Sequence, residues 1–424
     1  MTLLKDAVRL ILENVGVMDE EVRPLLQCLG QVLAEDVCSP LTLPMTPVGL
    51  PDGYAVRAED IARATPENPA VLHILGTSRA GCPAKIRVES KTAIRIMTGS
   101  VVPNGADCVI RFEDTDEPIE KNGPNLNNPK EVKVFKAGVI GEGIRSQGSA
   151  IREGNLLLPK GTLIAPHHIS TLASIGVTTL KVIRRPVFAV IPTGDELSKP
   201  GQPLAPGNVY DSNGPAIVAY VQQYGGIARH FGIARDKEGA LDAKIDRALH
   251  VDAIITSGGV SKGDYDLVRL VLARRGQIVF SRVKMGPGAS VAFSIINRPA
   301  EQGGHSNMIP VLSLSGPPVG CLVNLETLLR PALLKMRGFS QYDHPVVTAV
   351  VTEDFQRKMP FPFARWSKLQ RCNDGYSVDL NGSAPMGDLA SMAHANALTL
   401  VPGNNSLQAG DLIEVLPFEG WLYQ

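Results

Sequence analysis

The chain has few aromatic residues and no excess of charge of either sign. Aromatic residues make up 5% of its 424 positions, and 42 lysines and arginines balance 42 aspartates and glutamates. A protein that binds nucleic acid in general needs a basic surplus for its phosphate contacts, so this balance argues against such a partner. With 44% hydrophobic residues, the chain is long enough for two to four domains with ample cores.

Cysteine pairs and long apolar runs are also missing. The six cysteines are scattered and none forms a Cys-x-x-Cys pair, which argues against structural zinc and a disulfide framework and favours buried free thiols in a reducing compartment. No basic-then-apolar signal opens the chain, and no apolar stretch approaches the ~20 residues that span a bilayer. We therefore predict a cytoplasmic protein with no membrane partner.

The most informative stretch that is present runs from Val187 to Leu197. It is an apolar run of branched residues that stops at a small, doubly acidic turn. Such a run is typical of a buried strand, and the turn is the loop at its carboxyl end. In open α/β sheets, ligands bind outside the carboxyl ends of the strands. Gly194 would let the backbone approach a ligand there, and Asp195 and Glu196 would bring carboxylates to it.

Two further apolar runs end in small turns, at residues 257–261 and 315–318. Their backbone N–H groups and hydroxyls suit an anion, and Asp264 and Asp266 follow the first of them. Carboxylates beside phosphate-cradling turns indicate a Mg²⁺ ion shared with a phosphorylated ligand. One such turn is usually only a turn or an N-cap, but three in one sheet favour a site. The predicted ligand-binding residues are Thr193, Gly194, Asp195, Ser257, Gly258, Gly259, Ser261, Ser315 and Gly316.

Apolar periodicity divides the chain into regions of different secondary structure. Two amphipathic helices are predicted at the start, from Leu3 to Val15 and from Leu25 to Leu33. Short alternations between Gly and Pro turns over residues 52–134 indicate a β-rich region. From Arg185 to Leu334 strands alternate with helices, which is typical of a doubly wound, mostly parallel α/β sheet. The tail, 346–424, returns to the alternation of a small β-barrel-like domain.

Eight short motifs in collinear order extend over nearly the whole chain. The motifs are Leu33-Ala-Glu-Asp-Val37, Asp52-Gly-Tyr-Ala-Val56, Arg95-Ile-Met-Thr-Gly99, Val102-Pro-x-Gly-Ala106, Thr193-Gly-Asp-Glu-Leu197, Val209-Tyr-Asp-Ser-Asn213, Ser257-Gly-Gly-Val-Ser261 and Ala395-Asn-Ala-Leu398. Together they resemble the MoeA family of molybdopterin molybdenumtransferases, which is similar to the C-terminal domain of gephyrin.

The resemblance implies an elongated homodimer of four-domain subunits. Its active site lies between the α/β domain of one subunit and the β-rich domain of the other. We accordingly assign residues 1–50 and 138–178 to a discontinuous linker domain of helical and extended segments. Residues 51–137 then form the β-rich domain, 179–337 the molybdopterin-binding α/β domain, and 338–424 the C-terminal β domain.

The resemblance also implies a reaction in molybdenum cofactor biosynthesis. An adenylylated molybdopterin binds with Mg²⁺, molybdate enters, the pyrophosphate bond is hydrolysed, and AMP leaves. Glu196, Asp236 and Asp266 match the family carboxylates around Mg²⁺ and pyrophosphate, while Asp52 and Thr98 match positions that face the pocket across the dimer. Without the resemblance, Asp52 is a turn residue and Thr98 a capping hydroxyl. A molybdopterin adenylyltransferase and molybdoenzyme apo-proteins are the further partners implied.

The chain departs from the family in the turns that would hold an oxyanion. The family's Lys-Pro-Gly-Lys-Pro turn is here Met285–Ser290, which has lost both lysines, and its Pro-Gly-Asn-Pro turn is Ser315–Pro318. An anion site without two cations loses attraction and charge stabilisation. Arg282 and Lys284 lie just upstream and are candidates to compensate, provided that Lys284 does not point to the other face of its strand.

Four functions therefore stay open. The first is a MoeA-type insertion enzyme, with molybdate or tungstate as its substrate. The second is a non-inserting, pterin-binding or regulatory paralogue, which the missing lysines motivate. The third is an interaction scaffold of the gephyrin kind, and the fourth is adenylyl transfer to molybdopterin, against which the added β domains argue. The retained carboxylates favour the first, because a pure binder needs no acids clustered beside phosphate.

Overall fold

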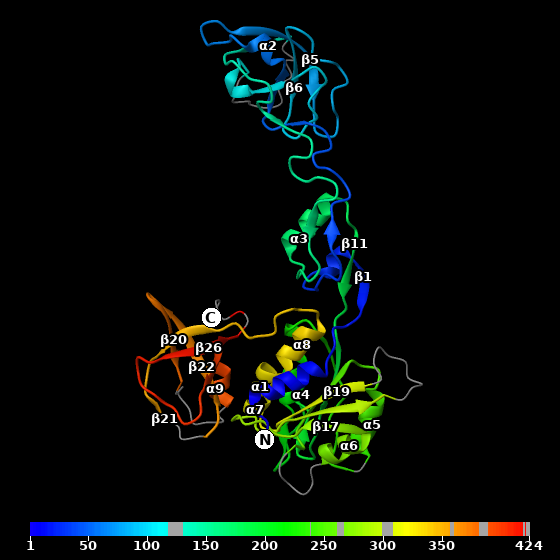
Figure 1. The fold of residues 1–424 in the computed structure, drawn as a ribbon, viewed down its shortest axis with the longest axis vertical. Coiled ribbons are helices and arrows are strands. Elements are labelled where there is room, and N and C mark those ends of the chain that lie inside the picture. Colours follow the sequence, from blue (N-terminus) through cyan, green and yellow to red (C-terminus); the bar gives the residue numbers. More distant parts are fainter. Residues whose placement is uncertain are drawn as a thin grey trace. The chain divides into compact units, whose positions relative to one another are not determined.

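The computed structural model describes residues 1–117, 130–237, 239–260, 267–298, 308–356, 360–380, 389–418 and 420. The chain forms two compact units (Figure 1). The first unit consists of Met1–Glu35, Gly161–Ile169 and Thr179–Gln424, and the second consists of Asp36–Lys160 and Ser170–Thr178. The finer division into four domains stays a prediction.

A six-stranded mixed sheet forms the centre of the first unit. Five strands run in the same direction, and β18 is antiparallel to both of its neighbours. In spatial order the strands are β15 (Ile227–His230), β12 (Val187–Pro192), β16 (Ala253–Ser257), β19 (Met308–Leu314), β18 (Ala292–Asn297) and β17 (Gly276–Phe280). The predicted mostly parallel α/β sheet is confirmed.

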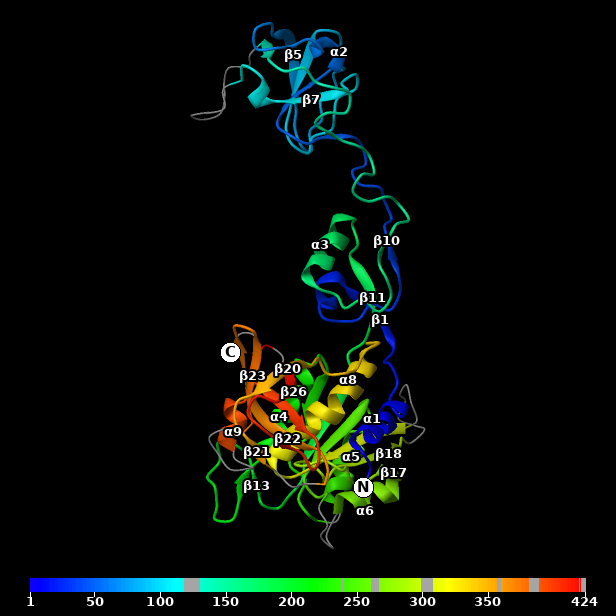
Figure 2. The same ribbon diagram turned by 60° about the vertical axis from the view of Figure 1, so that its left-hand side comes forward.

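Strand β18 is the element of this sheet that the sequence reading missed. It lies between β17 and β19 in the sheet, and Figure 2 shows it beside β17. It pairs antiparallel with both neighbours, and the connection from β17, residues 281–291, contains no helix that could serve as a crossover.

Helices cover both faces of this sheet, as Figure 1 shows for α1 and α4 on one side and α5 and α6 on the other. Along β12, Phe188 and Val190 pack toward the first group while Ala189 and Ile191 pack toward the second, because side chains alternate along a strand. Because β12 is buried on both faces, its sequence is a nearly continuous run of apolar residues.

The helices of the first unit include the predicted amphipathic helix at the start of the chain. Their bounds are α1 (Leu4–Glu13), α4 (Asn213–Gln223), α5 (Ala240–Arg247), α6 (Leu267–Arg275), α7 (Pro318–Asn324), a π-helical stretch at Leu325–Leu329, α8 (Arg330–Met336) and α9 (Leu389–His394). Within the described part of the chain, no helix has both the length and the apolar character to cross a bilayer.

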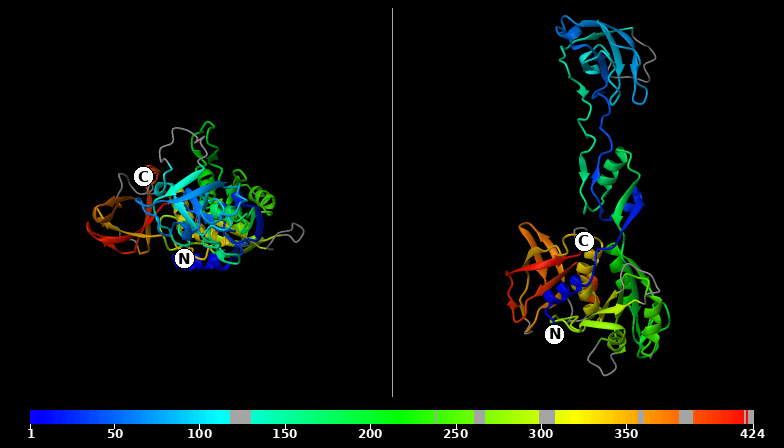
Figure 3. Two further views of the ribbon diagram at one scale, coloured as in Figure 1. Left: turned by 90° about the horizontal axis from the view of Figure 1, so that it is seen from above. Right: turned by 45° about the vertical axis from the view of Figure 1, so that its right-hand side comes forward.

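The C-terminal region of the first unit is a closed five-stranded barrel, which confirms the predicted β-barrel-like domain. Its strands are β20 (Val347–Val351), β23 (Gly375–Asp379), β22 (Phe363–Cys372), β24 (Ala397–Val401) and β26 (Leu412–Pro417), and a small pair, β21 (Phe355–Gln356) and β25 (Ser406–Leu407), lies outside the barrel ladder. In Figure 3 the orange and red barrel lies beside the green and yellow sheet. Ala364 and Leu398 of the barrel join the core on the α1 side of the sheet.

The second predicted helix, from Leu25 to Leu33, is wrong. The chain forms a short 3₁₀ turn at Leu25–Cys28, and Gly30 then adopts a φ of +71°, which helices do not use. Val32 and Leu33 continue in extended conformation and form bridges with Leu163 and Val182. Nearby, β1 (Glu20–Pro24) pairs with β11 (Thr179–Ile183).

The second unit is β-rich, as predicted. A five-stranded sheet has the order β7 (Cys108–Arg111), β4 (Gly53–Val56), β6 (Thr92–Ile96), β5 (Ala70–Ser78) and β8 (Glu131–Val134). Smaller elements of the chain are β2 (Val37–Cys38) with β10 (Leu156–Leu158), β3 (Val48–Gly49) with β9 (Ile144–Arg145), β13 (Leu197–Ser198) with β14 (Val209–Tyr210), and the helices α2 (Ala58–Ile61) and α3 (Pro166–Ser174).

The six cysteines are free, as predicted, but only three of them are buried. Cys28, Cys108 and Cys321 are buried, whereas Cys38, Cys82 and Cys372 are exposed.

Candidate functional site

The carboxyl ends of four parallel strands bring four loops to one edge of the central sheet. The loops follow β12, β15, β16 and β19. Thr193 ties three of them together, because it bridges Ala234 and donates its N–H to the carbonyl of Ser257 at 2.8 Å. The described members of the predicted ligand-binding set therefore gather at one edge, as the strand-end rule requires.

Arg235 fastens the loop after β12 to the loop after β15. Its Nη1 donates to the carbonyl oxygens of Gly194, Asp195 and Leu197 at 3.3, 2.8 and 3.0 Å. This contact fixes the backbone that carries the acidic turn. The sequence reading passed over Arg235, although its position next to Asp236 at a strand end was the available signal.

Two of the predicted carboxylates hold each other's backbones across these loops. The N–H of Asp195 donates to Oδ2 of Asp236 at 3.3 Å, and the N–H of Asp236 donates to Oδ1 of Asp195 at 3.1 Å. Both residues are exposed. The remaining oxygen of each carboxylate accepts no hydrogen bond from the described residues, so it is available to a ligand.

Glu196 brings a third carboxylate to the same place. It folds back over Gly194, where a Cβ atom would lie 2.4 Å from its Oε2. Gly194 also has a φ of +147°, which L side chains rarely adopt. The backbone conformation therefore favours glycine at this position, and the Glu196 carboxylate occupies the space that a Cβ atom would take.

These carboxylates fit one common mode of Mg²⁺ binding. Within the described part of the chain, no three acidic, histidine or cysteine side chains converge as a protein-only metal site would require. Mg²⁺ is usually held by one or two carboxylates together with phosphate oxygens and water, and Glu196 and Asp236 could supply those carboxylates. Asp266, the third predicted ligand, and Ser261 lie outside the described residues.

The Ser-Gly-Gly turn packs tightly on the neighbouring loop. A Cβ atom at Gly258 would lie 2.4 Å from the Thr193 carbonyl oxygen, and Gly258 has a φ of +91°. The hydroxyl of Thr193 donates to the carbonyl of Ser257 at 3.1 Å, and both residues are buried. Thr193 and Ser257 therefore support the turn from below, while Gly259 is exposed at its rim.

A side chain at the start of α4 holds the third turn, residues 315–318. Asn213 donates its Nδ2 hydrogen to the carbonyl of Gly316 at 2.8 Å, and Ser315 is buried with its hydroxyl 3.4 Å from the Pro317 carbonyl oxygen. Ser315 therefore supports the turn, and Gly316 is exposed beside Gly258 of the preceding loop.

A buried aspartate, Asp211, pairs with the exposed His230 behind this edge, and the sequence analysis assigned the pair no role. Oδ2 of Asp211 is 3.1 Å from Nε2 of His230, whose Nδ1 accepts the N–H of Gly232 at 3.0 Å. Nε2 therefore carries the proton and donates to the carboxylate. Oδ1 of Asp211 accepts the N–H of Gly214 at the start of α4, and the Val209–Asn213 motif was the available signal.

Cys321 is a buried free thiol near Asp211, and its position raises the question of whether it could act as a nucleophile. Burial, and then the charge of Asp211, raise the pKa of the Cys321 thiol. A thiol that stays protonated is a poor nucleophile, so covalent chemistry through this cysteine is excluded at neutral pH.

In the second unit, the structure brings the two other predicted catalytic residues together. Oδ1 of Asp52 accepts the N–H of Thr98 at 2.7 Å and its hydroxyl at 2.9 Å. Both residues are exposed. Their motifs are neighbours because β4 and β6 pair with Tyr54 opposite Arg95.

The two motifs also share a buried network beneath that pair. Tyr54 donates its hydroxyl to Glu117, and Arg95 donates to the same carboxylate, with Nη2 2.8 Å from Oε1. Burial and the neighbouring Glu117 raise the pKa of Tyr54, so the phenol stays a hydrogen-bond donor. Arg95 also lies over the ring of Phe112, 4.5 Å from its centroid. This network stabilises the sheet that presents Asp52 and Thr98.

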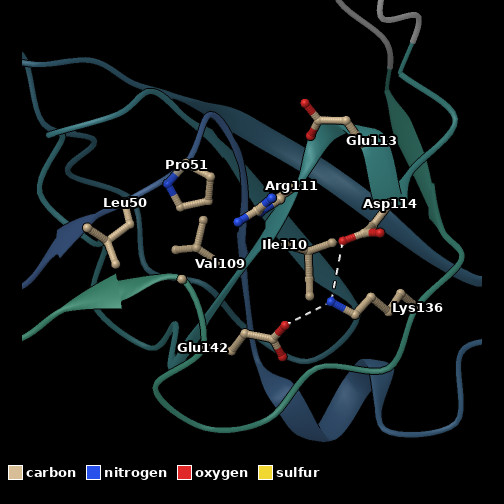
Figure 4. A pocket seen from close by; sticks show the side chains of 10 residues that line it. Leu50, Pro51, Val109, Ile110, Arg111, Glu113, Asp114, Lys136 and Glu142 are labelled. Atoms are coloured by element: carbon tan, nitrogen blue, oxygen red, sulfur yellow. Dashed lines mark hydrogen bonds and ion pairs between the residues drawn. The ribbon is translucent and has the colours of Figure 1, made fainter.

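A cavity of about 690 Å³ lies in the second unit, and Leu50 and Pro51, which precede Asp52 in the sequence, are among its lining residues. Figure 4 shows Arg111 and Lys136 on its walls, with Lys136 between the carboxylates of Asp114 and Glu142 at 3.6 and 3.0 Å. Those contacts raise the pKa of Lys136, chiefly through its hydrogen bond to Glu142. The positive charge of Lys136 is therefore compensated by two carboxylates of the protein, whereas Arg111 forms no ion pair with the described residues.

The turn that lacks the two lysines packs against the C-terminal barrel. Gly286 donates its N–H to the carbonyl of Pro362 at 3.1 Å and accepts the N–H of Ala364 at 2.7 Å. A Cβ atom at Gly286 would lie 3.2 Å from the ring of Phe363. Lys284 is exposed and Arg282 is half-buried. A side chain at Gly286 would press on aromatic rings, whereas Ala289 already carries a Cβ atom and is half-buried.

We therefore expect Ala289→Lys to strengthen oxyanion binding and Gly286→Lys to lower stability instead. A returned ammonium group adds a charge-assisted contact, so the Kd for molybdate should fall about tenfold. Equilibrium titration with molybdate and with tungstate measures the change, and Ala289→Gln is the neutral control. An unchanged Kd in Ala289→Lys would show that this turn does not line the oxyanion site.

Two family models match successive parts of the chain. "MoeA N-terminal region (domain I and II)" matches residues 2–176, and "Probable molybdopterin binding domain" matches residues 189–335. The second match contains all four strand-end loops.

Relatives and solved structures match over nearly the full length. Proteins named molybdopterin molybdenumtransferase from Staphylococcus epidermidis and Staphylococcus aureus are 32% and 30% identical, over 97% of this chain and 94% of theirs. A molybdopterin biosynthesis MoeA protein from Pyrococcus horikoshii has 29% identity and a TM-score of 0.80, with 99% of this chain and 100% of that chain covered.

Proposed function

The chain belongs to the MoeA family of molybdopterin molybdenumtransferases, enzymes of molybdenum cofactor biosynthesis, and we propose that it inserts molybdate into adenylylated molybdopterin with release of AMP. The observation that carries this proposal is that the loops with Asp195, Glu196 and Asp236 lie at the same sheet edge as the Gly258–Gly259 turn. Acidic groups beside a phosphate-cradling turn suit a pyrophosphate held with a divalent cation.

The residues of this edge have distinct tasks in that reaction. Glu196 and Asp236 would hold Mg²⁺ through carboxylate oxygens, with Asp266 as the third ligand from the family. Bound there, Mg²⁺ would supply charge neutralisation at the pyrophosphate. The Gly258–Gly259 turn would offer backbone N–H groups to phosphate oxygens. Arg235 keeps the Gly194–Leu197 backbone in place, so the carboxylates need no reorganisation when the ligand binds.

Asp52 and Thr98 form the second half of the proposed site. The hydrogen bonds between them leave Oδ2 of Asp52 exposed without a partner among the described residues. A carboxylate oriented in this way can position the water that attacks the pyrophosphate, and accept its proton. We propose that this pair acts on the ligand held by the α/β domain of a second copy.

The homodimer that this arrangement needs is itself a proposal. It is supported by exposed apolar side chains on the first unit at Val22, Leu26 and Leu29 around β1 and the 3₁₀ turn. Leu26→Lys is expected to give a folded monomer, because Leu26 is 78% exposed and its replacement disturbs no core. Sedimentation equilibrium measures the association. A dimer of unchanged affinity would contradict this surface.

Single-turnover insertion tests the proposed function directly. Purified protein is mixed with adenylylated molybdopterin, Mg²⁺, and molybdate or tungstate, and AMP release is followed by chromatography. Oxyanion-dependent AMP release is the expected result, and the faster oxyanion identifies the preferred metal. Ligand binding without AMP release would overturn the proposal. That result would favour the non-inserting, pterin-binding alternative, which the neutral turn at Met285–Ser290 motivates.

A further inference from the structure

A second cavity, of about 640 Å³, lies in the first unit at the opposite edge of the central sheet. Arg185 lies just before β12, and Tyr224 lies between α4 and β15, so the cavity is at the amino ends of these strands. The proposed reaction takes place at their carboxyl ends. The other walls come from Arg330 and Arg337 around α8, from the segment that contains His344, and from Phe418 after β26.

The described lining of this cavity contains basic but no acidic side chains. Arg185, Arg330 and Arg337 belong to it, and no aspartate or glutamate does. Glu326 is behind the wall, where its Oε2 is 3.2 Å from Nε2 of His344. This local excess of cations contrasts with the zero net charge of the whole chain.

Arg330 is the buried member of this group, with 8% of its surface exposed. Its Nη1 donates to the carbonyls of Tyr342 and Asp343 at 3.3 and 3.2 Å, and its guanidinium lies over the ring of Tyr224, 5.4 Å from the centroid. Its Nε is buried and has no partner within the described residues. Neutral carbonyls satisfy some N–H groups but leave the charge uncompensated, which is costly at this depth.

We propose that this cavity binds a small molecule carrying a phosphate or diphosphate group. The cavity is of the size that takes a nucleotide or a diphosphate rather than a single ion. Guanidinium groups match the geometry of phosphate oxygens, and one such anion would compensate Arg185 and Arg330 together. The site is separate from the carboxylate loops, so it would regulate the enzyme or retain a product rather than take part in insertion.

Calorimetric titration tests this site with inorganic pyrophosphate, AMP and adenosine as probes, in the absence of Mg²⁺. Pyrophosphate and AMP are expected to bind and adenosine is not, and a tighter Kd for AMP would indicate a nucleotide rather than free diphosphate. Arg330→Lys keeps the charge but loses the forked N–H donors of the guanidinium group, and Arg185→Gln removes a half-buried cation. Each should raise the Kd for the tighter probe about tenfold, the loss expected of one charge-assisted contact.

The matched control is Arg247→Gln, which removes the same charge from the exposed face of α5, outside this cavity. It should leave the Kd unchanged. Insertion rates at saturating substrate should be the same in all three variants, which separates this site from the catalytic loops. No binding of either phosphate probe, or equal Kd values in Arg185→Gln, Arg330→Lys and the wild type, would overturn the proposal, whether or not the protein inserts metal.

Discussion

Asp236→Asn should lower single-turnover AMP release on the order of a hundredfold. The amide oxygen can still accept the N–H of Asp195, so the loop pairing survives while one negative charge is removed from the proposed Mg²⁺ site. Loss of one anionic ligand costs about 3 kcal/mol of the stabilisation that a metal ion supplies, which corresponds to this factor. The rate should recover in part as Mg²⁺ is raised, because the defect is in metal affinity.

Asp374→Asn provides the matched control for this experiment. It makes the same substitution at an exposed position in the turn between β22 and β23, away from the strand-end loops. Turnover should equal that of the wild type. If Asp236→Asn also turns over normally at every Mg²⁺ concentration, Asp236 has no part in the mechanism, and the acidic edge of the sheet has a structural role alone.

Gly53→Ala should unfold the second unit while the first unit stays folded. A Cβ atom at Gly53 would lie 1.8 Å from the carbonyl oxygen of Ile110, because β4 and β7 approach closely at this point. Neither strand can move without breaking the sheet that presents Asp52 and Thr98. We expect at least about 3 kcal/mol of destabilisation, at the upper end of overpacking.

Hydrogen exchange distinguishes the two units in that variant. Protection should be lost in β4, β6 and β7 and kept in β12, β16 and β19. Gly76→Ala is the control within the same sheet, since a Cβ atom there meets only Ile86, at 3.8 Å. Equal protection of β4 in Gly53→Ala and Gly76→Ala would mean that the strands have more room than the structure indicates.

The acidic edge of the α/β sheet could be predicted from the sequence because it depends on local patterns. An apolar run ending in a Gly-Asp-Glu turn specifies a strand and the loop after it, and parallel pairing then brings all such loops to one edge. For the same reason, alternation indicated the β-rich unit and the C-terminal barrel. The eight motifs added the family, but not the contacts that each residue makes.

Contacts between segments that are far apart in the sequence could be identified only from the tertiary structure. The role of Arg235 depends on where three backbone carbonyls point, and the Asp211–His230 pair joins an α4 cap to the end of β15. The periodicity of the sequence predicts neither of these contacts, because the directions of the hydrogen bonds are set only once the strands are paired.

The sequence alone therefore determined the class of fold, the family and the identity of the acidic groups, since these follow from pattern and composition. The tertiary structure decided which residues face a ligand and which support the loops from below. It also showed that Gly286 lies against the ring of Phe363, whereas Ala289 is half-buried. It also gathered three arginines around a cavity at the opposite edge of the sheet, because residues scattered along the chain become neighbours only when helices pack on strands.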